Sequence, residues 1–325
     1  MNQGLRTAAA VAEVTRLSLA PTAVSNIYLA AIWSRQVEQR PALAGWDFWP
    51  LMALMGVIGI GMYVFGSTMN DVLDARRDRL FSPDRPIPSR RMTMTHVTVV
   101  ALVGLLVAVG CAILLGPNHA LMALVCAGLI VFYNAAGKHL PAVGVLTLGL
   151  IRAALMLIAD PTLGFFWPVW LNMTHVVFIS ALVHRLSRKR PYLAPQELWV
   201  LAGGWVFWTL AMVFWMSHRG SIAIGGLPML WVGPIVAGVL ALAAGTWLIQ
   251  TSDDDQQAGR RVYDVGMIWL IIYDGSWLLT AGLWSVAWVF GVLLVLAAAL
   301  LRGRAMVQAL GGAGPQYLPD RRVGM

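Results

Sequence analysis

Long, uninterrupted apolar blocks are the feature that most constrains how this chain can fold. Several blocks exceed the roughly 18 residues that mark a membrane-spanning helix. A helix satisfies its own backbone hydrogen bonds in lipid, so each block is predicted to cross the bilayer as a helix. The predicted helices cover approximately residues 17–34, 49–70, 96–115, 119–134, 143–160, 165–184, 198–216, 230–249, 262–281 and 284–301.

Composition argues against a water-soluble protein. Of the 325 residues, 59% are hydrophobic and only 12% are charged, whereas a soluble domain carries about a quarter charged residues. We therefore predict an all-α fold, a polytopic transmembrane bundle of nine to ten helices. This single domain is predicted to span residues 1–301, with a cytoplasmic C-terminal tail at 302–325.

Lys and Arg residues gather in alternate loops between the apolar blocks. The basic loops cover 71–91, 135–142, 185–197 and 251–261. By the positive-inside rule, we expect these loops to share the cytoplasmic face of a membrane, predicted to be a bacterial inner membrane. The basic tail prefers the same side, which requires an even number of helices and favours ten.

The net charge of +8 has the same origin. Basic loops follow the positive-inside rule and attract anionic lipid headgroups, so the lipid bilayer is the expected partner. Nucleic acid is not an expected partner, because the basic residues lie between membrane segments rather than on a soluble domain.

An acidic cluster at the end of the second predicted helix is the main candidate site. Residues 70–78 read Asn-Asp-Val-Leu-Asp-Ala-Arg-Arg-Asp. In a helix, Asn70, Asp74 and Asp78 would stack on one face, with Asp71 flanking it. Cβ atoms at these spacings lie roughly 5–6 Å apart. Carboxylates this close repel one another unless a cation lies between them.

The chemistry of these side chains points to magnesium. All-oxygen ligands suit Mg²⁺, which keeps several waters and is usually completed by substrate phosphates. A solvated helix end, with each carboxylate paired to a neighbouring arginine, is the alternative. Three Asp and one Asn in phase at the edge of an apolar helix favour the metal site, with a phosphate or diphosphate as the ligand.

Two motifs resemble a known family. The pattern N-D-x-x-D-x-x-x-D at 70–78, followed by R-P-I-P-S at 85–89, resembles the first aspartate-rich motif of the UbiA prenyltransferase superfamily. Tyr133 and Lys138 fit the Tyr-x-x-x-x-Lys pattern that the family carries between its fourth and fifth helices. The resemblance implies a membrane-embedded enzyme that moves a prenyl group from a prenyl diphosphate to a lipophilic or phosphorylated acceptor.

The resemblance also implies residue roles at a site that faces the cytoplasm. Arg85 and Lys138 would contact the diphosphate, and Tyr133 would line the pocket near the reacting carbon. Asn26 would be a further substrate-binding residue in the first helix. The implied Mg²⁺ ligands are Asn70, Asp71, Asp74 and Asp78, and the implied catalytic residues are Asp71, Asp74, Lys138 and Tyr133.

The sequence departs from the family after the sixth predicted helix. A second acidic motif, Asp-x-x-x-Asp, is usual there, but residues 179–192 contain no carboxylate. One hypothesis is that Arg188, Lys189 and Arg190 contact the diphosphate in place of a second metal ion. Another is that the protein binds or moves a prenylated lipid without turnover. The basic run is also explained by positive-inside charge alone.

One further carboxylate stands out because it lies within an apolar helix. Asp274 falls inside the ninth predicted helix. A carboxylate in lipid is costly and is by default a functional hypothesis. We therefore expect the ninth helix to face the cavity.

Overall fold

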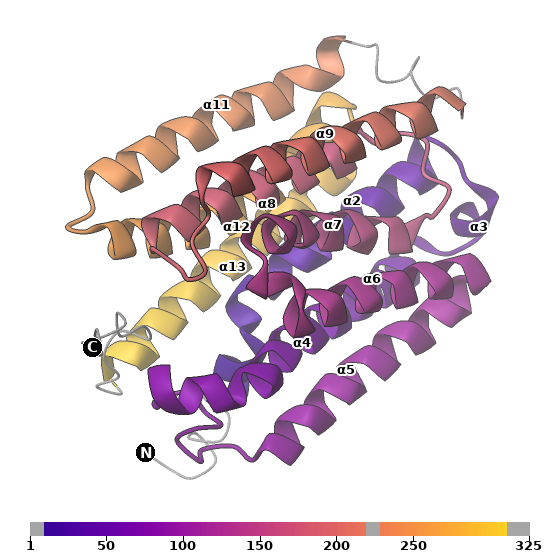
Figure 1. Cartoon of the computed structure of the whole chain (residues 1–325). Helices are drawn as coiled ribbons and strands as arrows, with labels where there is room; N and C mark the ends of the chain where they lie inside the picture. Colours follow the sequence, from indigo (N-terminus) through magenta and orange to yellow (C-terminus); the bar gives the residue numbers. More distant parts are fainter. Residues whose placement is uncertain (1–9, 219–227, 311–325) are drawn as a thin grey trace.

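The computed structural model describes residues 10–218 and 228–310. All regular structure in these ranges is helical, which confirms the predicted all-α class (Figure 1). The α-helices are α2 (Ala20–Gln36), α3 (Pro41–Ala44), α4 (Phe48–Phe81), α5 (Met94–Leu115), α6 (Pro117–Ala135), α7 (Pro141–Ala159), α8 (Trp167–Leu186), α9 (Pro195–His218), α11 (Pro228–Gln250), α12 (Asp255–Thr280) and α13 (Trp284–Leu310). Two 3₁₀ helices, η1 (Leu17–Leu19) and η2 (Gly137–His139), precede α2 and α7.

The number of membrane segments matches the prediction of nine to ten. Nine helices within the described residues are long and apolar enough to cross a membrane. The remaining predicted segment is α2, which is one residue short of the 18 usually counted, at 17 residues. Fourteen of its residues are buried, because it lies among α4, α7, α12 and α13. The chain is therefore an integral membrane protein with α2 at its centre.

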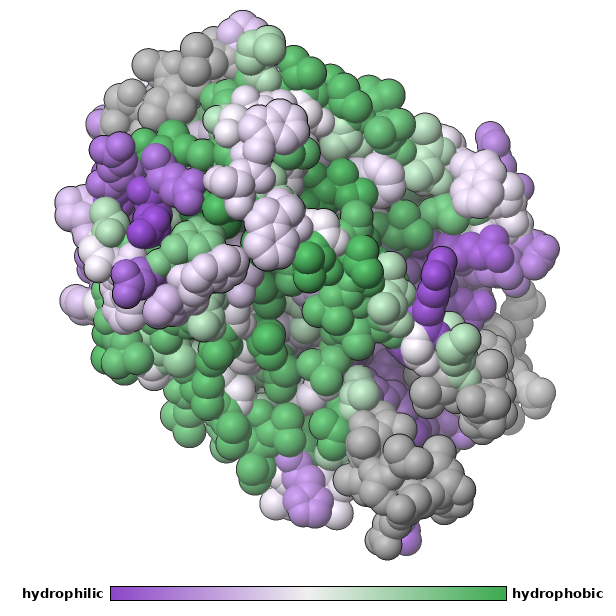
Figure 2. Space-filling model, turned by 180° about the vertical axis from the view of Figure 1, so that it is seen from behind, coloured by the Kyte–Doolittle hydropathy of each residue, from purple (hydrophilic) through white to green (hydrophobic). Residues whose placement is uncertain are grey.

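The helices differ in how much of their surface faces the lipid. In the most apolar part of α7, 67% of residues are buried, against 11% in α9 and 17% in α11. Figure 1 shows α9 and α11 along one edge of the bundle, with α7 inside it. Figure 2 shows an apolar belt between two hydrophilic ends, as expected for a protein that spans a bilayer.

Helix α4 is fixed by close packing against α5. A Cβ atom added to Gly61 would lie 2.7 Å from the carbonyl oxygen of Gly104, so the two backbones touch at this crossing. Small residues allow such an approach between membrane helices and the dispersion contacts that come with it. This contact holds the segment from which the aspartates project.

All the predicted basic loops lie at the same end of the bundle, which we call the aspartate end because it carries Asp71. Four ion pairs at this end join chain segments that are far apart in sequence. They are Arg16–Asp71, Lys138–Asp74, Arg188–Asp255 and Arg304–Asp264. The prediction that the basic loops share one face is thereby confirmed, while their cytoplasmic orientation stays a prediction.

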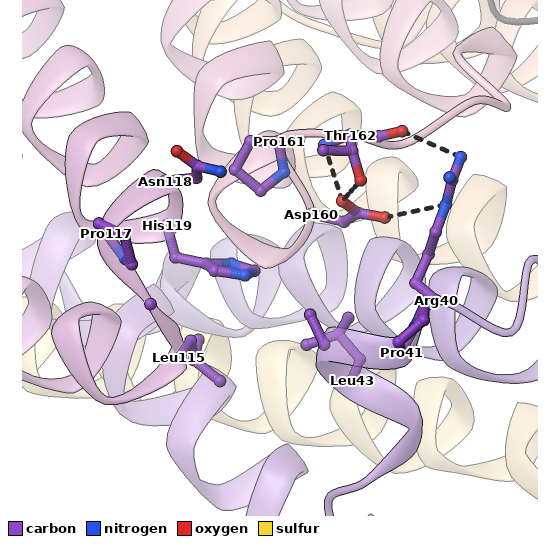
Figure 3. Close-up of a pocket in the computed structure, with 12 residues that line it drawn as sticks. Arg40, Pro41, Leu43, Leu115, Pro117, Asn118, His119, Asp160, Pro161 and Thr162 are labelled. Atoms are coloured by element: carbon purple, nitrogen blue, oxygen red, sulfur yellow. Dashed lines mark hydrogen bonds and ion pairs between the residues drawn. The ribbon is translucent and has the colours of Figure 1, made fainter.

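A cavity of about 350 Å³ lies at the opposite end, between the loops that connect α2 to α4, α5 to α6 and α7 to α8 (Figure 3). Asp160, on its wall, accepts hydrogen bonds from Ser34 Oγ at 2.7 Å and from both the amide and the hydroxyl of Thr162. Arg40 Nε lies 3.8 Å from the same carboxylate. These contacts tie the end of α2 and the α2–α4 connection to the α7–α8 loop, far from the aspartate end.

Three predicted helix boundaries differ from the structure by more than four residues. Helix α4 continues beyond residue 70 to Phe81, so the whole acidic cluster is helical. Helix α12 begins at Asp255, because the side chain of Asp254 caps it by accepting from the Gln257 amide at 2.6 Å. Helix α13 continues beyond residue 301 to Leu310, and the rest of the predicted tail lies outside the described residues.

Candidate functional site

Asp71 and Asp78 face the same way on the last turns of α4. Both are buried, with 6% and 5% of their surfaces exposed. Seven residues turn an α-helix by about 700°, which is about 20° short of two full turns. Asn70 and Asp78 are out of phase by about 80° on the same reckoning. The pair that the helix aligns is therefore Asp71 with Asp78, rather than the predicted stack that begins at Asn70.

Arg85 joins these two carboxylates. Its Nη1 atom lies 2.7 Å from Asp78 Oδ2 and 3.7 Å from Asp71 Oδ1. The loop that carries Arg85 folds back because Ile87 is buried in a small cluster with Val14 and other apolar residues. The R-P-I-P-S motif thus anchors its arginine over the aspartates of α4, which explains why the two halves of the motif occur together.

Lys138 reaches the third aspartate from another part of the chain. Its Nζ atom lies 2.6 Å from Asp74 Oδ1, and both side chains are largely buried. Lys138 belongs to the η2 turn, which packs tightly on the start of α7: a Cβ on Gly144 would lie 2.7 Å from the carbonyl oxygen of Gly137. The close packing of these glycines holds Lys138 toward α4.

Arg16 is a site residue that sequence reasoning missed. Its Nη2 atom lies 3.2 Å from Asp71 Oδ1. The residue has a left-handed backbone with a φ of 48°, and it immediately precedes η1. Tyr133 lies near enough to interact electrostatically with its guanidinium. The available signal was a lone basic residue at the entrance to the first apolar segment, on the face that carries the basic loops.

Lys189 is the predicted basic residue of the α8–α9 loop that approaches the aspartates. Burial lowers the pKa of its ammonium group, and the nearby positive charges of Arg16 and Arg85 lower it further. Like charges depress a lysine pKa in this way only when they are close. Lys189 therefore lies close to Arg16 and Arg85, the two arginines that pair with Asp71 and Asp78.

The neighbours of Lys189 point elsewhere. Arg188 Nη2 lies 3.0 Å from Asp255 Oδ2, with both side chains more than half exposed. Arg190 Nε donates to the Tyr192 hydroxyl at 3.1 Å, and its guanidinium lies over the Tyr192 ring. Of the three basic residues predicted here, Lys189 lies near the arginines of the site. Arg188 and Arg190 contact Asp255 and Tyr192 at its margin.

The charges of the site leave room for an anion. Three carboxylates, Asp71, Asp74 and Asp78, face four cations, Arg16, Arg85, Lys138 and Lys189, so these groups sum to +1. The cations come from four separate segments and converge on two turns of one helix. Such convergence of basic groups in a partly buried site favours an anionic ligand with several charges.

The metal prediction needs a closer look at the same groups. Within the described residues, no three His, Cys, Asp or Glu side chains are placed so that they could hold a metal ion together. Arg85 instead stands between Asp71 and Asp78, with one nitrogen facing both carboxylates. The guanidinium of Arg85 thus holds a positive charge between the carboxylates of Asp71 and Asp78. Carboxylate oxygens are ligands that suit a hydrated Mg²⁺.

Two asparagines complete the polar surroundings. Asn70 Nδ2 lies 3.5 Å from Asp71 Oδ1, at the limit of a hydrogen bond. Asn134 follows Tyr133 in the predicted motif and is buried, with its Nδ2 donating to the Ile130 carbonyl oxygen at 2.9 Å. Its Oδ1 is buried and has no donor among the described residues. Asn134 therefore has a free acceptor inside the protein.

Asn26 belongs to a different cluster, deep in the bundle. Its Nδ2 lies 2.7 Å from Asp274 Oδ2 and 3.1 Å from Asn172 Oδ1. Asp274 is fully buried and also accepts from Ser25 Oγ at 2.5 Å. These contacts join α2, α8 and α12, so the ninth predicted helix directs Asp274 into a buried polar cluster.

Comparison with known proteins agrees with this geometry. Residues 41–189 match the sequence model of the UbiA prenyltransferase family. The matched span contains the acidic cluster, Arg85, Lys138 and Lys189, while Arg16 lies before it. The resemblance predicted from the sequence motifs is therefore confirmed.

Two solved structures share the fold. A structure of a digeranylgeranylglyceryl phosphate synthase superposes with a TM-score of 0.57 at 15% identity, covering 85% of this chain and 98% of that one. The apo structure of a UbiA homolog from Aeropyrum pernix K1 gives a TM-score of 0.54 at 16% identity, covering 79% of this chain and 96% of that one. At this identity the likeness shows a common fold.

A curated relative matches part of the chain. The digeranylgeranylglyceryl phosphate synthase of Methanococcus maripaludis strain C5 is 28% identical over 126 residues. The match covers 38% of this chain and 43% of that relative, so the chain matches less than half of the relative's length.

Proposed function

We propose that the protein is a Mg²⁺-dependent intramembrane prenyltransferase, because residues 41–189 match the sequence model of the UbiA prenyltransferase family. It moves a prenyl group from a prenyl diphosphate to a lipophilic or phosphorylated acceptor. The observation that carries the proposal is the sharing of one Arg85 nitrogen by Asp71 and Asp78, with the further cations Arg16 and Lys189 close by.

Asp71 and Asp78 are the residues that would hold Mg²⁺, with Asp74 and Asn70 beside them. Bound there, the ion would neutralise charge on the diphosphate and make it a better leaving group. For Asp71 and Asp78 to bind it, Arg85 must turn from the carboxylates toward the diphosphate. The arginine is then already in place to contact the phosphate oxygens with its planar guanidinium.

The fixed cations stabilise the charge that develops during the reaction. The C1–O bond of the prenyl diphosphate breaks, and diphosphate leaves with the bonding electrons. An acceptor atom forms the new bond to C1, and the acceptor loses a proton. Arg16, Arg85 and Lys138 are positioned before the reaction begins, so little reorganisation is needed as negative charge grows on the leaving group. Tyr133, near Arg16, lines the same region.

Lys189 supplies charge where the family has its second acidic motif. That motif is absent, and the loop instead directs an ammonium group toward Arg16 and Arg85. We propose that Lys189 contacts the diphosphate and that one metal ion suffices. Arg188 and Arg190, at the margin, are proposed to attract the substrate at longer range.

The prenyl chain would lie among apolar side chains of the bundle, and the lipid bilayer would supply substrate and receive product. By the positive-inside rule, the basic loops support a site that faces the cytoplasm. For a bacterial chain this membrane is the inner membrane. Diphosphate can then leave into the cytoplasm, and the prenylated product can leave into the bilayer.

The test is Mg²⁺-dependent diphosphate release from labelled geranylgeranyl diphosphate, with a panel of acceptors. Asp71→Asn is expected to lower release by at least about 100-fold, the range found when one preorganised electrostatic group is lost. Asp84→Asn is the matched control, because Asp84 is an exposed aspartate of the adjacent loop. Binding that needs Mg²⁺ and Asp71 but gives no release with any acceptor would favour a protein that carries prenylated lipids.

A further inference from the structure

The cavity at the end opposite the aspartates is not used by the proposed reaction. Its volume of about 350 Å³ lies within the range of roughly 300–1,000 Å³ that holds small ligands. The residues of its rim are exposed, whereas those of its floor are buried. The rim carries Pro41, Ala42, Pro117, Asn118 and Thr162, and the floor carries Leu43, Leu115, His119 and Asp160.

His119 offers a hydrogen-bond acceptor to this cavity. The residue is 6% exposed, and its Nδ1 lies 2.8 Å from the carbonyl oxygen of Ile158. A carbonyl oxygen only accepts, so Nδ1 carries the proton and Nε2 of the neutral ring is an acceptor. Among the described residues, no bond to Nε2 is recorded, and Figure 3 shows the ring pointing into the space between Pro161 and Leu43. A donor on a ligand can therefore bind at the cavity floor.

Asp160 gives the floor a negative charge that the protein compensates poorly. Arg40 pairs with Glu38 at 2.7 Å and lies 3.8 Å from Asp160, so the three groups sum to −1. Arg35, the other described arginine at this end, donates to the carbonyl oxygen of Trp46 and does not line the cavity. A buried carboxylate is stabilised by an opposite charge within hydrogen-bonding reach. The floor therefore favours a ligand with a positively charged donor.

The N-terminus of α6 lines the same cavity with the opposite polarity. The helix begins at Pro117, after Gly116, which has no side chain to cap it. The backbone N–H groups of Asn118 and His119 have no recorded acceptor within the described part of the chain. Free N–H groups and the helix dipole attract a negative group to such a terminus. The cavity thus offers acceptors on its floor and donors on one wall, which suits a zwitterion.

The surface beside the cavity is apolar and faces lipid. Ile113 and Leu114 end α5, Leu121 and Leu124 lie in the first turns of α6, and all four are more than half exposed. Gly116, which joins the two helices, lines the cavity. A phospholipid can therefore place its headgroup in the cavity and its acyl chains along α5 and α6. A soluble ligand would leave this adjoining surface unused.

We propose that the cavity binds a zwitterionic phospholipid whose headgroup carries a primary ammonium, such as phosphatidylethanolamine. The ammonium donates to Asp160 and to His119 Nε2, and the phosphate accepts from the N-terminus of α6. A trimethylated ammonium has no N–H to donate, and a glycerol headgroup has no positive charge, so each satisfies only part of the site. The lipid binds the folded bundle alone and therefore stabilises it.

The experiment measures lipid affinity by native mass spectrometry of the full-length protein in detergent. Phosphatidylethanolamine, phosphatidylcholine and phosphatidylglycerol with identical acyl chains are compared. Phosphatidylethanolamine should bind at least about 10-fold more tightly than the other two, as for one hydrogen bond to a charged group. It should also raise the melting temperature more than they do. Glycerophosphoethanolamine, which has the headgroup without the chains, should bind much more weakly.

Two variants test the assigned contacts. His119→Asn keeps an amide N–H for the Ile158 carbonyl oxygen but lacks Nε2, and Asp160→Asn removes the negative charge. Each should lower the affinity for phosphatidylethanolamine by about 10-fold and leave that for phosphatidylcholine unchanged. His96→Asn and Asp47→Asn are the matched controls, because both residues are exposed and lie outside the cavity. Unchanged affinity for a prenyl thiolodiphosphate shows that each variant is folded, and His119→Asn decides the test if Asp160→Asn does not fold.

Three results would overturn the inference. Equal affinity for the three phospholipids would show that the headgroup is not recognised. A preference for phosphatidylethanolamine that survives in a folded His119→Asn or Asp160→Asn variant would place its site elsewhere. Equal affinity for glycerophosphoethanolamine and for the intact lipid would assign the cavity to a soluble ammonium compound.

Discussion

Arg85 Nη1 lies 2.7 Å from Asp78 Oδ2, and the same nitrogen faces Asp71. The two carboxylates lie two turns apart on α4, and the arginine comes from the loop after it. A charge-assisted contact of this length is among the stronger hydrogen bonds in proteins. It keeps the acidic pair ordered and compensated while no substrate is bound, and it places the arginine where a diphosphate would arrive.

Replacing Arg85 should weaken substrate binding. Arg85→Gln removes a phosphate contact, and we expect the affinity for a prenyl thiolodiphosphate to fall by about 10- to 100-fold, because hydrogen bonds to charged groups contribute about 1.5–3 kcal/mol. Isothermal titration in Mg²⁺ measures the change. Arg79→Gln is the control, since Arg79 is an exposed arginine on the last turn of α4. Equal losses in both variants would show that only general positive charge matters.

Lys189→Gln should change stability and binding in opposite directions. Arg16 and Arg85 repel Lys189 in the protein without substrate, so its removal is expected to raise the melting temperature by about 1–3 °C, for a repulsion on the order of 1 kcal/mol. Diphosphate affinity should fall, because the same ammonium group contacts the ligand. Arg188→Gln should leave the melting temperature nearly unchanged and should lower diphosphate affinity less than Lys189→Gln does, since Arg188 pairs with Asp255 at the exposed margin.

The pH dependence of this stability difference follows from the lowered pKa of Lys189. As pH rises, the folded protein loses this proton before the unfolded chain does. The unfolded chain then binds more protons, so the parent becomes more stable with rising pH up to the unfolded pKa of about 10.4. The gap in melting temperature between Lys189→Gln and the parent should therefore shrink between pH 8 and pH 10. A gap that is constant over this range would show that Lys189 is not repelled.

The metal requirement should be that of one ion. With Lys189 in place of the second acidic motif, diphosphate release is expected to depend hyperbolically on free Mg²⁺, with a Hill coefficient of about 1 when prenyl diphosphate is saturating. Chelation with EDTA should abolish release, and added Mg²⁺ should restore it. A sigmoidal dependence with a coefficient near 2 would contradict the single-ion account and place a second metal ion at the site.

Asp160 should matter for stability alone. It joins Ser34, Thr162 and Arg40 at the end of the bundle opposite the aspartates. Asp160→Ala leaves these donors unpaired and is expected to cost about 2–3 kcal/mol. The affinity for a prenyl thiolodiphosphate should stay unchanged. Asp47→Ala is the control, because Asp47 is exposed and its side chain makes no capping bond. A change in diphosphate affinity in Asp160→Ala would show that the two ends are coupled.

Much of this fold could be predicted because each membrane helix is recognisable from one continuous stretch of sequence. Each apolar block is long enough to span the bilayer, and loop charge orders the ends. The aspartates and Arg85 were predictable for the same reason, since they lie within 15 residues of each other around one helix end. The prediction still chose the wrong pair. It placed Asn70 on the same helical face as Asp78, whereas the rotation of about 100° per residue aligns Asp71 with Asp78.

The missed contacts join residues that are distant in sequence. Arg16 meets Asp71 across 55 residues, and Arg152 meets Asn26 across 126. No local sequence pattern predicts such a contact, because it depends on how α2 packs among the other helices. The charge of the α8–α9 loop also could not predict which of Arg188, Lys189 and Arg190 lies at the site. The left-handed backbone of Arg188, with a φ of 46°, is a property of the folded loop.

The most direct test of the account is the affinity of a prenyl thiolodiphosphate for the parent protein and for Asp71→Asn/Asp78→Asn, measured by isothermal titration with Mg²⁺ and with EDTA. Tight binding is expected only for the parent with Mg²⁺, and the affinity should fall by at least about 100-fold in the variant or in EDTA. Equal affinity in EDTA, or in the variant, would contradict a magnesium-diphosphate site on these two carboxylates.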